Sequence, residues 1–236
     1  MKLIVLGSGT CVPSLKRSAP AYFLEAEGRQ ILVDCGSGTL LQLERIGKSY
    51  KDIDAVFITH THPDHIADLM PLIHALLATP LFTREKDLFL IGSKGFKKFY
   101  EKCIASVMGK PKTFSIQTIE IEDKMDYPPF QILAAKTVHS ENSIAFRFEY
   151  RGKSLVITGD ADYDQDIIEL SNNTDLLIAD CSFTESMKGQ GHMTPKECGL
   201  VAKKAGARKL LLSHFYPLPF PDDERIKECK QVFDGD

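Results

Sequence analysis

Short hydrophobic runs, rich in Val, Ile, Leu and Phe, recur along the chain with the length and spacing of β-strands. Ten runs predict strands at residues 3–7, 22–26, 30–36, 55–60, 88–92, 130–139, 144–150, 154–160, 175–181 and 209–215. The dipeptides Glu27-Gly28 and Arg151-Gly152 predict hairpin turns within two of the adjacent pairs. Between other runs, apolar residues recur every three or four positions and predict helices at residues 66–77, 96–108 and 194–206. The alternation indicates an α/β protein.

Local signals refine two of these helices. Thr194 and Pro195 form a typical helix start, and Gly206 a typical stop, for the helix at 194–206. Six residues at helical spacing predict the buried face of the helix at 96–108: Phe96, Phe99, Tyr100, Cys103, Ile104 and Val107. The hairpins that end in DCGSG near residue 36 and TGDAD near residue 160 are weakly alike. We therefore expect two related β-rich halves with helices outside them.

Composition narrows the class of protein. A chain of 236 residues with 43% hydrophobic and 26% charged residues fits a single globular domain spanning residues 1–236. The net charge of −3 provides no global basic field to attract nucleic acid. The first apolar run is too short for a signal peptide, and no run is long enough to span a membrane. The six scattered cysteines are expected to be reduced thiols of a cytoplasmic protein.

The stretch ITHTHPDH at residues 58–65 holds three of the seven histidines and an aspartate. His60 and His62 lie two apart in an extended segment and can point the same way, and Asp64 and His65 begin the next predicted helix. Imidazole nitrogen and carboxylate oxygen are ligands of zinc. Four donors in one turn suit two metal ions, about 3.5–4 Å apart, better than one ion.

The segment THTHPDH resembles the H-x-H-x-D-H signature of the metallo-β-lactamase superfamily. Further segments resemble that family in the same order along the chain: LVDCG at 32–36, His139 at the end of a predicted strand, the TGD turn with Asp160, and His214 after KLLLS. The resemblance covers nearly the whole chain. It implies a four-layer αβ/βα sandwich with the metal site at one edge of two sheets.

The resemblance also implies a set of metal ligands. Seven residues would hold two zinc ions: His60, His62 and His139 the first, Asp64, His65 and His214 the second, with Asp160 bridging. His62 stands where the oxygen-reducing di-iron branch of the family has a glutamate, which favours hydrolysis. Manganese or iron can also occupy such sites. Asp34 is expected to orient a ligand imidazole, and His74 to lie on a helix face without binding metal.

One further histidine separates branches of the family. His192, in GQGHMTPKE, lies where the branch of ribonuclease Z and related phosphodiesterases has an H-x-T segment. In that branch an acidic residue in a segment like HEATF orients this histidine. Here the segment is ADCSF, so Asp180 takes that position and Ala179 replaces the histidine. The resemblance implies catalytic roles for His192 as general acid and for Asp180 as its partner, with Asp64 serving catalysis as well as metal binding.

These residues suit phosphodiester hydrolysis, in which a metal-bound hydroxide attacks phosphorus and His192 protonates the leaving group. The interval between His139 and Asp160 is too short for the long tRNA-binding arm that bacterial ribonucleases Z carry there. We therefore expect a short or cyclic phosphodiester as substrate, and structured tRNA to be a poor one. Three alternatives stay open: a tRNA 3′-processing endonuclease, an ester, lactone or thioester hydrolase, and a metal-binding accessory protein without turnover.

The chain after His214 is rich in aromatic residues and prolines. Phe215, Tyr216 and Phe220 could wall the pocket or form the interface of a homodimer. The sequence does not decide between these two roles.

Overall fold

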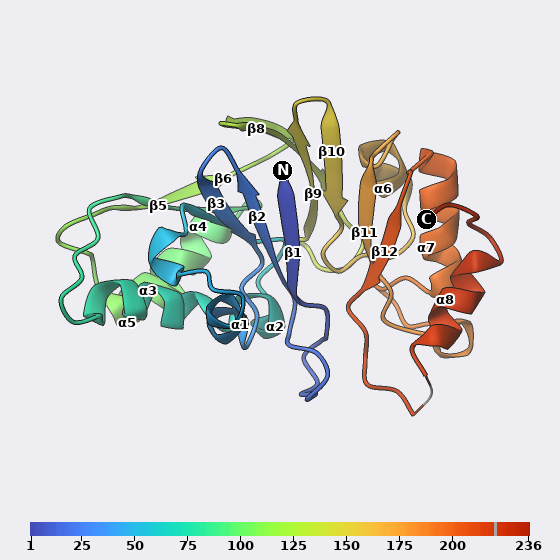
Figure 1. The fold of residues 1–236 in the computed structure, drawn as a ribbon, viewed down its shortest axis with the longest axis horizontal. Coiled ribbons are helices and arrows are strands. Elements are labelled where there is room, and N and C mark those ends of the chain that lie inside the picture. Colours follow the sequence, from blue (N-terminus) through green and yellow to red (C-terminus); the bar gives the residue numbers. More distant parts are fainter. Residues whose placement is uncertain (220) are drawn as a thin grey trace. The chain divides into compact units, whose positions relative to one another are not determined.

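A computed structural model describes residues 1–219 and 221–236 of the chain. Phe220, one of the C-terminal aromatic residues considered above, lies outside the described residues. The contacts divide the chain into two compact units, Met1–Ile121 and Glu122–Asp236. Each unit contains one six-stranded mixed sheet with helices (Figure 1).

The sheet of the first unit follows chain order from β1 to β6. Its strands are β1 (Lys2–Gly7), β2 (Ala21–Ala26), β3 (Arg29–Val33), β4 (Ala55–Phe57), β5 (Leu88–Gly92) and β6 (Ile116–Glu120). The first three strands pair antiparallel, and β3 to β6 pair parallel. Strand β6 is absent from the sequence-based prediction. The other five strands were predicted.

The helices of the first unit are α1 (Thr39–Arg45), η1 (Tyr50–Asp52), α2 (Pro63–Ile66), α3 (Leu69–Ala78), α4 (Phe96–Phe99), η2 (Tyr100–Ala105) and α5 (Ser106–Met108). The segment 96–108 is helical as predicted, but η2 is a π-helical turn. A π-turn widens the helix and shifts which side chains face inward. Phe96, Tyr100 and Ile104 are buried as predicted, whereas Cys103 and Val107, predicted on the same face, are exposed, Val107 to 68%.

The sheet of the second unit has the order β12-β11-β10-β9-β8-β7. Its strands are β7 (Lys124–Tyr127), β8 (Phe130–Lys136), β9 (Ile144–Tyr150), β10 (Lys153–Ile157), β11 (Leu176–Asp180) and β12 (Leu210–Ser213). Strands β7 to β10 pair antiparallel, and β10 to β12 pair parallel. The helices are α6 (Gln165–Leu170), η3 (Glu185–Met187), α7 (Pro195–Ala205) and α8 (Asp223–Lys230). Helix α7 contacts β11, β12, α6 and α8 (Figure 1).

Turns and caps form where the sequence predicts them. Glu27 and Gly28 both have positive φ (47° and 78°), as do Arg151 and Gly152 (49° and 72°). Two consecutive residues of this kind make the tight turn that matches the twist of a hairpin. Helix α7 begins with a capping box formed by Thr194 and Glu197 and ends at Gly206 in the left-handed conformation.

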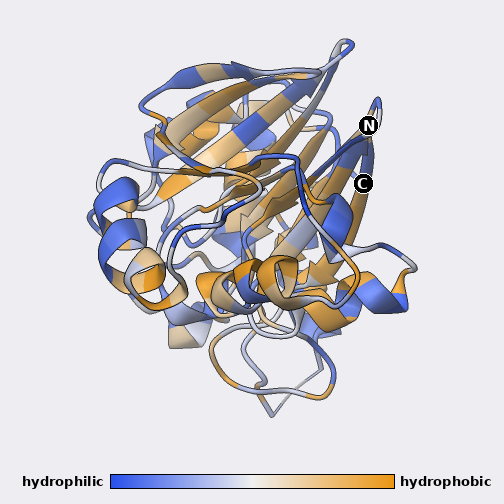
Figure 2. Ribbon diagram, turned by 90° about the vertical axis from the view of Figure 1, so that its left-hand side faces the viewer, coloured by the Kyte–Doolittle hydropathy of each residue, from blue (hydrophilic) through white to orange (hydrophobic). Residues whose placement is uncertain are grey.

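Each unit has its own apolar core. In the first, side chains of β2 to β5 pack against α3 and the helical segment 96–108. In the second, α6, α7 and α8 cover the end of the sheet formed by β10, β11 and β12. Figure 2 shows mainly hydrophobic residues along the strands and a mixture of hydrophobic and hydrophilic residues along the helices. All six cysteines are free thiols, as predicted. No helix in the described part of the chain combines the length and the apolar character that a membrane crossing requires.

Polar residues gather where the parallel strands end. Asp34 follows β3, Thr59 and His60 follow β4, Asp180 ends β11, and His214 follows β12. Such carboxyl ends are where α/β sheets generally place their sites. His139 differs from the prediction, because β8 stops at Lys136. The amide of Thr137 donates to the carbonyl of Ser143 (3.1 Å) in a turn, so His139 lies in a loop beyond the strand.

Candidate metal centre

The segment 58–65 of the first unit is fixed by its backbone. His62 is the N-cap of α2, and Pro63 is its first residue, a position where the missing N–H costs nothing. The amide of Cys35 donates to the carbonyl of His65 (2.8 Å). A Cβ on Gly36 would collide with the carbonyl oxygen of Asp64, so only glycine lets this segment approach the turn after β3.

Asp34 organises the histidines of this segment. Its carboxylate accepts hydrogen bonds from Nδ1 of His65 (2.8 Å) and from the amide of Thr59 (2.8 Å). The Thr59 hydroxyl donates to the same carboxylate, at 2.9 Å from Oδ2, and lies 3.1 Å from Nδ1 of His60. Asp34, Thr59, His60 and His65 are all buried. Asp34 thus makes the contact to His65 that its expected role, orienting a ligand imidazole, requires.

These contacts fix where the imidazole protons lie. A carboxylate can only accept, so His65 carries its proton on Nδ1. Because the Thr59 proton is donated to Asp34, the Thr59 oxygen accepts from Nδ1 of His60. In the neutral rings, Nε2 of His60 and Nε2 of His65 then carry lone pairs. Nε2 is the atom that each ring would offer to a metal ion.

Each of these two nitrogens lies beside an atom of another predicted ligand. Nε2 of His60 lies 3.0 Å from Nδ1 of His62, and Nε2 of His65 lies 3.8 Å from Oδ2 of Asp64. Neutral imidazole and carboxylate are the ligand types that zinc accepts. The first unit therefore brings the four predicted ligands together in two pairs, His60 with His62 and Asp64 with His65, whose donor types suit a divalent cation.

A cavity of about 370 Å³ in the first unit opens beside Asp64. Thr10, Ser14, Arg17, Ser18 and Ser37 are among the residues that line it. Arg17 donates to the Ser8 hydroxyl (2.8 Å). A cation and several hydroxyls beside a candidate ligand suit an anionic substrate group.

In the second unit, His139 and His214 converge on Asp160. Nε2 of His139 lies 3.5 Å from Oδ2 of Asp160, and Nε2 of His214 lies 3.2 Å from Oδ1. Nδ1 of His139 donates to the carbonyl of Gly191 (2.9 Å), which leaves the lone pair of the neutral ring on Nε2. A Cβ on Gly191, at φ 78°, would lie 2.9 Å from that ring nitrogen. Asp160 thus lies beside both predicted histidine ligands of this unit, and the three residues are of donor types that suit a cation.

Asp180 and His192 form the second feature of this unit. Nδ1 of His192 lies 2.7 Å from Oδ2 of Asp180, as the sequence predicts for this pair. Both groups are nearly buried, with 12% of the His192 side chain and none of the Asp180 side chain exposed. One candidate ligand atom from each of Asp160, Asp180, His192 and His214 lies within 4.8 Å of the others. The candidate acid pair therefore adjoins the candidate ligands of its own unit.

Two of the candidate residues have an unusual backbone. Asp34 and His214 both have φ of 58°, in the left-handed region that non-glycine residues rarely adopt. Such conformations concentrate at functional sites, where the surrounding structure holds them. Each one turns a side chain at a strand end into the cluster of its own unit.

Lys188 holds the loop that carries His192. Its ammonium group donates to the carbonyl of His192 (2.7 Å) and to carboxylates of Asp162 and Glu197. Burial acts to lower the pKa of Lys188, but its hydrogen bonds to the carboxylates of Asp162 and Glu197, together with their negative charges, outweigh burial, and the pKa is raised. Lys188 is therefore a fixed cation that ties this loop to its surroundings at neutral pH.

One aromatic residue after His214 lies in the apolar core, and two others border His192. Phe215 is buried in the core of the second unit, with the Arg225 guanidinium over its ring. Tyr216 stacks on Phe183 with 5.3 Å between ring centroids, and both rings meet His192 edge-on. Phe183 and Tyr216 thus form an aromatic wall beside His192.

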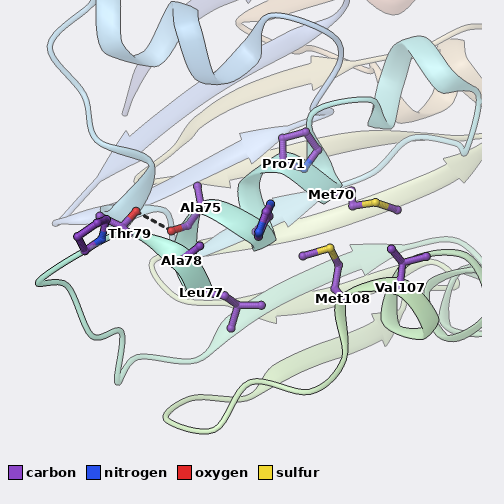
Figure 3. Close-up of a pocket in the computed structure, with 10 residues that line it drawn as sticks. Met70, Pro71, Ala75, Leu77, Ala78, Thr79, Val107 and Met108 are labelled. Carbon is purple, nitrogen blue, oxygen red and sulfur yellow. Dashed lines mark hydrogen bonds between the residues drawn. The ribbon is translucent and has the colours of Figure 1, made fainter.

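Sequence reasoning missed the two hydroxyls of Thr59 and Ser182. It correctly set His74 apart, because this residue lies on the exposed side of α3 and contributes to a separate cavity of about 860 Å³. Figure 3 shows that cavity between α3 and the segment of Val107 and Met108, lined mainly by apolar side chains. It contains none of the predicted metal ligands.

Comparison with known proteins identifies the family. The model of the beta-lactamase superfamily domain matches residues 29–215. The chain belongs to the beta-lactamase superfamily. The probable metallo-hydrolase YhfI of Bacillus subtilis is 33% identical over 243 residues, covering 100% of this chain and 95% of YhfI. The crystal structure of YhfI matches with a TM-score of 0.87 at 31% identity, over 99% of this chain and 93% of that chain.

Ribonucleases Z are also similar to this beta-lactamase superfamily member. Ribonuclease Z of Archaeoglobus fulgidus is 25% identical over 291 residues, covering 99% of this chain and 94% of the relative. The crystal structure of the short form of human tRNase Z matches with a TM-score of 0.79 at 26% identity, over 92% of this chain and 93% of that chain. The chain thus has the metallo-β-lactamase α/β fold and is related to YhfI and ribonuclease Z. This fold implies a divalent metal, and the His and Asp clusters can bind one.

Proposed function

We propose that this protein is a dinuclear metal-dependent phosphodiesterase that acts on short or cyclic phosphodiesters. The observation that carries the proposal is the contact of Asp180 with Nδ1 of His192 (2.7 Å), beside the donor set of Asp160. A carboxylate-held imidazole next to metal-type donors supplies a proton donor for a leaving group. The family resemblance assigns such a pair to the branch of ribonuclease Z and related phosphodiesterases, which favours a phosphodiester over a carboxylic ester or lactone.

The proposed ligands are those that the family resemblance implies. His60, His62 and His139 would hold one ion, Asp64, His65 and His214 the other, with Asp160 between them. The lone pairs assigned to Nε2 of His60, His65 and His139 support this role, because each ring offers that atom. Zinc suits these nitrogen and oxygen donors, and manganese or iron would also be accepted. When bound, two such ions supply Lewis-acid activation of water and neutralise charge on a phosphoryl group.

The residues of the chain then divide the remaining work. His192, when protonated, donates its Nε2 proton to the departing oxygen. Asp180 accepts a hydrogen bond from Nδ1 of His192 and stabilises the imidazolium cation. Lys188 keeps the backbone of His192 in place (2.7 Å to its carbonyl). Asp64 and Arg17 both line the cavity of about 370 Å³. Asp64 would bind metal and would also serve catalysis by facing the substrate bound there.

Two observations favour small diesters over structured tRNA. The interval between His139 and Asp160 contains only β9, β10 and a two-residue turn, so no arm extends there. The alignment with the Archaeoglobus ribonuclease Z runs over 291 positions, whereas this chain has 236 residues. The relative therefore carries segments that this chain lacks. Contacts to phosphates dominate the affinity of proteins for nucleic acid, so less basic surface weakens it.

The tRNA 3′-processing endonuclease is the second candidate, because several relatives are ribonucleases Z. An ester, lactone or thioester hydrolase on the same scaffold, and a metal-binding accessory protein without turnover, are the others. A substrate panel separates all four. Protein of known metal content is assayed with bis-aryl and cyclic phosphodiesters, a pre-tRNA, a lactone and a thioester, with metal-stripped protein as the control.

The proposed function requires that the small diesters give the highest kcat/KM and that stripping the metal abolishes the reaction. Efficient 3′ cleavage of pre-tRNA at physiological salt would replace it by the endonuclease function. Preferred turnover of the lactone or thioester, or fully metallated protein without any turnover, would contradict it.

A further inference from the structure

The hydroxyl of Ser182 contacts the candidate acid His192 and two of the groups around it. Its oxygen lies 2.6 Å from Oδ1 of Asp180, 2.8 Å from Nδ1 of His214 and 3.1 Å from Nδ1 of His192. Ser182 itself is completely buried. A buried hydroxyl with three polar neighbours cannot exchange these partners for water. It can donate its single proton to only one of them and can only accept from the others.

The carboxylate decides where that proton goes. Asp180 can only accept, so the Ser182 O–H donates to its Oδ1. The Ser182 oxygen is then left to accept, and the imidazole nitrogen at 2.8 Å must be the donor. His214 is therefore held with its proton on Nδ1. His192 already donates from Nδ1 to Oδ2 of Asp180 at the shorter distance of 2.7 Å, so it does not compete for the Ser182 oxygen.

We infer that Ser182 is a positioning residue that locks the tautomer of His214 and ties this ring to the carboxylate that holds His192. The inference rests on the proposed metal role of His214. The lock leaves the lone pair of His214 on Nε2, the atom 3.2 Å from Oδ1 of Asp160. Asp180 thus serves two imidazoles, His192 directly and His214 through Ser182.

The first unit contains the same arrangement at a different place in the chain. Asp34 contacts His65 directly (2.8 Å), and it contacts His60 through the Thr59 hydroxyl, which lies 2.9 Å from the carboxylate and 3.1 Å from the ring. Each unit therefore uses one carboxylate and one hydroxyl to fix two imidazoles. This recurrence favours a positioning function over the incidental filling of a buried polar gap.

The test uses the full-length protein and three variants. Ser182→Ala removes the acceptor of the His214 proton, and Ser182→Thr keeps it. Ser171→Ala is the matched control, because Ser171 is equally buried in the second unit and its hydroxyl has no hydrogen-bond partner within the described residues. Affinity for zinc is measured on metal-stripped protein by competition with a chromogenic chelator.

Loss of such an outer partner of a ligand weakens metal binding by about 10–100-fold. Ser182→Ala should show a loss of that order at the proposed site of His214, Ser182→Thr should restore most of the affinity, and Ser171→Ala should match the unmodified protein. Ser182→Ala with unchanged zinc affinity would overturn the inference. His214→Ala, measured in parallel, identifies the cause: if it too leaves zinc affinity unchanged, the proposed metal centre fails together with the inference.

A second readout does not depend on metal or turnover. The ¹⁵N chemical shifts of the histidine rings in metal-stripped protein report which nitrogen carries the proton, and the His214→Ala spectrum assigns the signals. His214 should carry its proton on Nδ1 in the unmodified protein and in Ser171→Ala, and should shift toward the Nε2–H form in Ser182→Ala. A His214 ring with its proton on Nε2 in the unmodified protein would refute the lock directly.

Discussion

Oδ2 of Asp34 lies 2.8 Å from Nδ1 of His65, and Oδ2 of Asp180 lies 2.7 Å from Nδ1 of His192. Both carboxylates follow or end a parallel strand and are completely buried on their side-chain atoms. A buried carboxylate of this kind sets the orientation and the tautomer of the imidazole it holds. The first pair serves a proposed metal ligand, and the second serves the proposed acid.

Replacing Asp34 by Asn should weaken metal binding in the first unit. The amide would disturb the contacts to His65 and Thr59, and through Thr59 the contact to His60. Zinc affinity is expected to fall by about 10–100-fold, the usual effect of losing such a partner. Chelator competition on metal-stripped protein measures it. Asp54→Asn is the control, since Asp54 is equally buried but bonds Gln30 and Arg29 away from the histidines. Equal losses in both variants would show that Asp34 has no specific role.

Gly36→Ala should displace the segment that carries Asp64. Its added methyl would meet the Asp64 carbonyl oxygen, which is backbone and cannot rotate away. Forced overpacking of this kind costs about 1–3 kcal/mol, and we expect zinc content to fall with the free energy of unfolding. Gly28→Ala, in a hairpin turn with open space around it, should lose stability through its positive φ but keep its zinc. Denaturant melts and metal analysis of both variants decide; full zinc content in Gly36→Ala would refute the prediction.

His192→Ala should separate chemistry from metal binding. This residue is not a proposed ligand, so the variant should keep its metal and its fold while turnover falls by about 10²–10⁴-fold. Diesters with poor alkoxide leaving groups should suffer more than aryl diesters, whose leaving groups are stable as anions. Kinetics with one alkyl and one aryl diester, together with metal analysis, provide the measurement. Loss of metal, or unchanged rates with both substrates, would exclude the acid role.

Asp180→Asn provides a contrast to that variant. Its loss of turnover should have the same leaving-group dependence but be smaller, because the imidazole itself remains. Unlike His192→Ala, it should also weaken zinc binding, since Asp180 holds His214 through Ser182 (2.6 Å and 2.8 Å).

Lys188→Met should loosen the loop of His192. The variant removes a cation that contacts Asp162, Glu197 and the carbonyl of His192, at a cost of about 1 kcal/mol. The pKa of Lys188 is raised above its usual value, so its contribution is complete at neutral pH and is lost only as the pH rises through that higher value. In the unmodified protein, the rate of protease cleavage within residues 185–192 should therefore be constant from pH 6 to 9. In Lys188→Met the cleavage should be faster. If the unmodified protein already becomes sensitive to protease within this pH range, the ion-pair account is contradicted.

The sequence predicts local features best where a short-range rule determines them. The hairpin turns at Glu27-Gly28 and Arg151-Gly152 and the cap of α7 at Thr194 follow from residues next to one another. Strands β6 and β7 were missed because IQTIE and KMDY contain few apolar residues and depend on neighbouring strands for their pairing. The π-turn in the helix at 96–108 changes the buried face without any marker in the sequence.

The candidate site divides in the same way. The predicted ligands and the Asp180–His192 pair could be proposed from the resemblance of their segments to family motifs, and the structure contains the contact between Asp180 and His192 (2.7 Å). Thr59 and Ser182 could not, because serine and threonine are frequent and their role depends on neighbours distant in the chain. Thr59 gains its role from Asp34, 25 residues earlier, and Ser182 from His214, 32 residues later.

Titration of metal-stripped protein with zinc, while hydrolysis of bis(p-nitrophenyl) phosphate is followed, tests the dinuclear phosphodiesterase most directly. Such an enzyme should be inactive without metal, and its rate should rise until two zinc ions per chain are bound. Hydrolysis by the metal-free protein, a rate that reaches its maximum with one ion per chain, or no hydrolysis with both ions bound would contradict it.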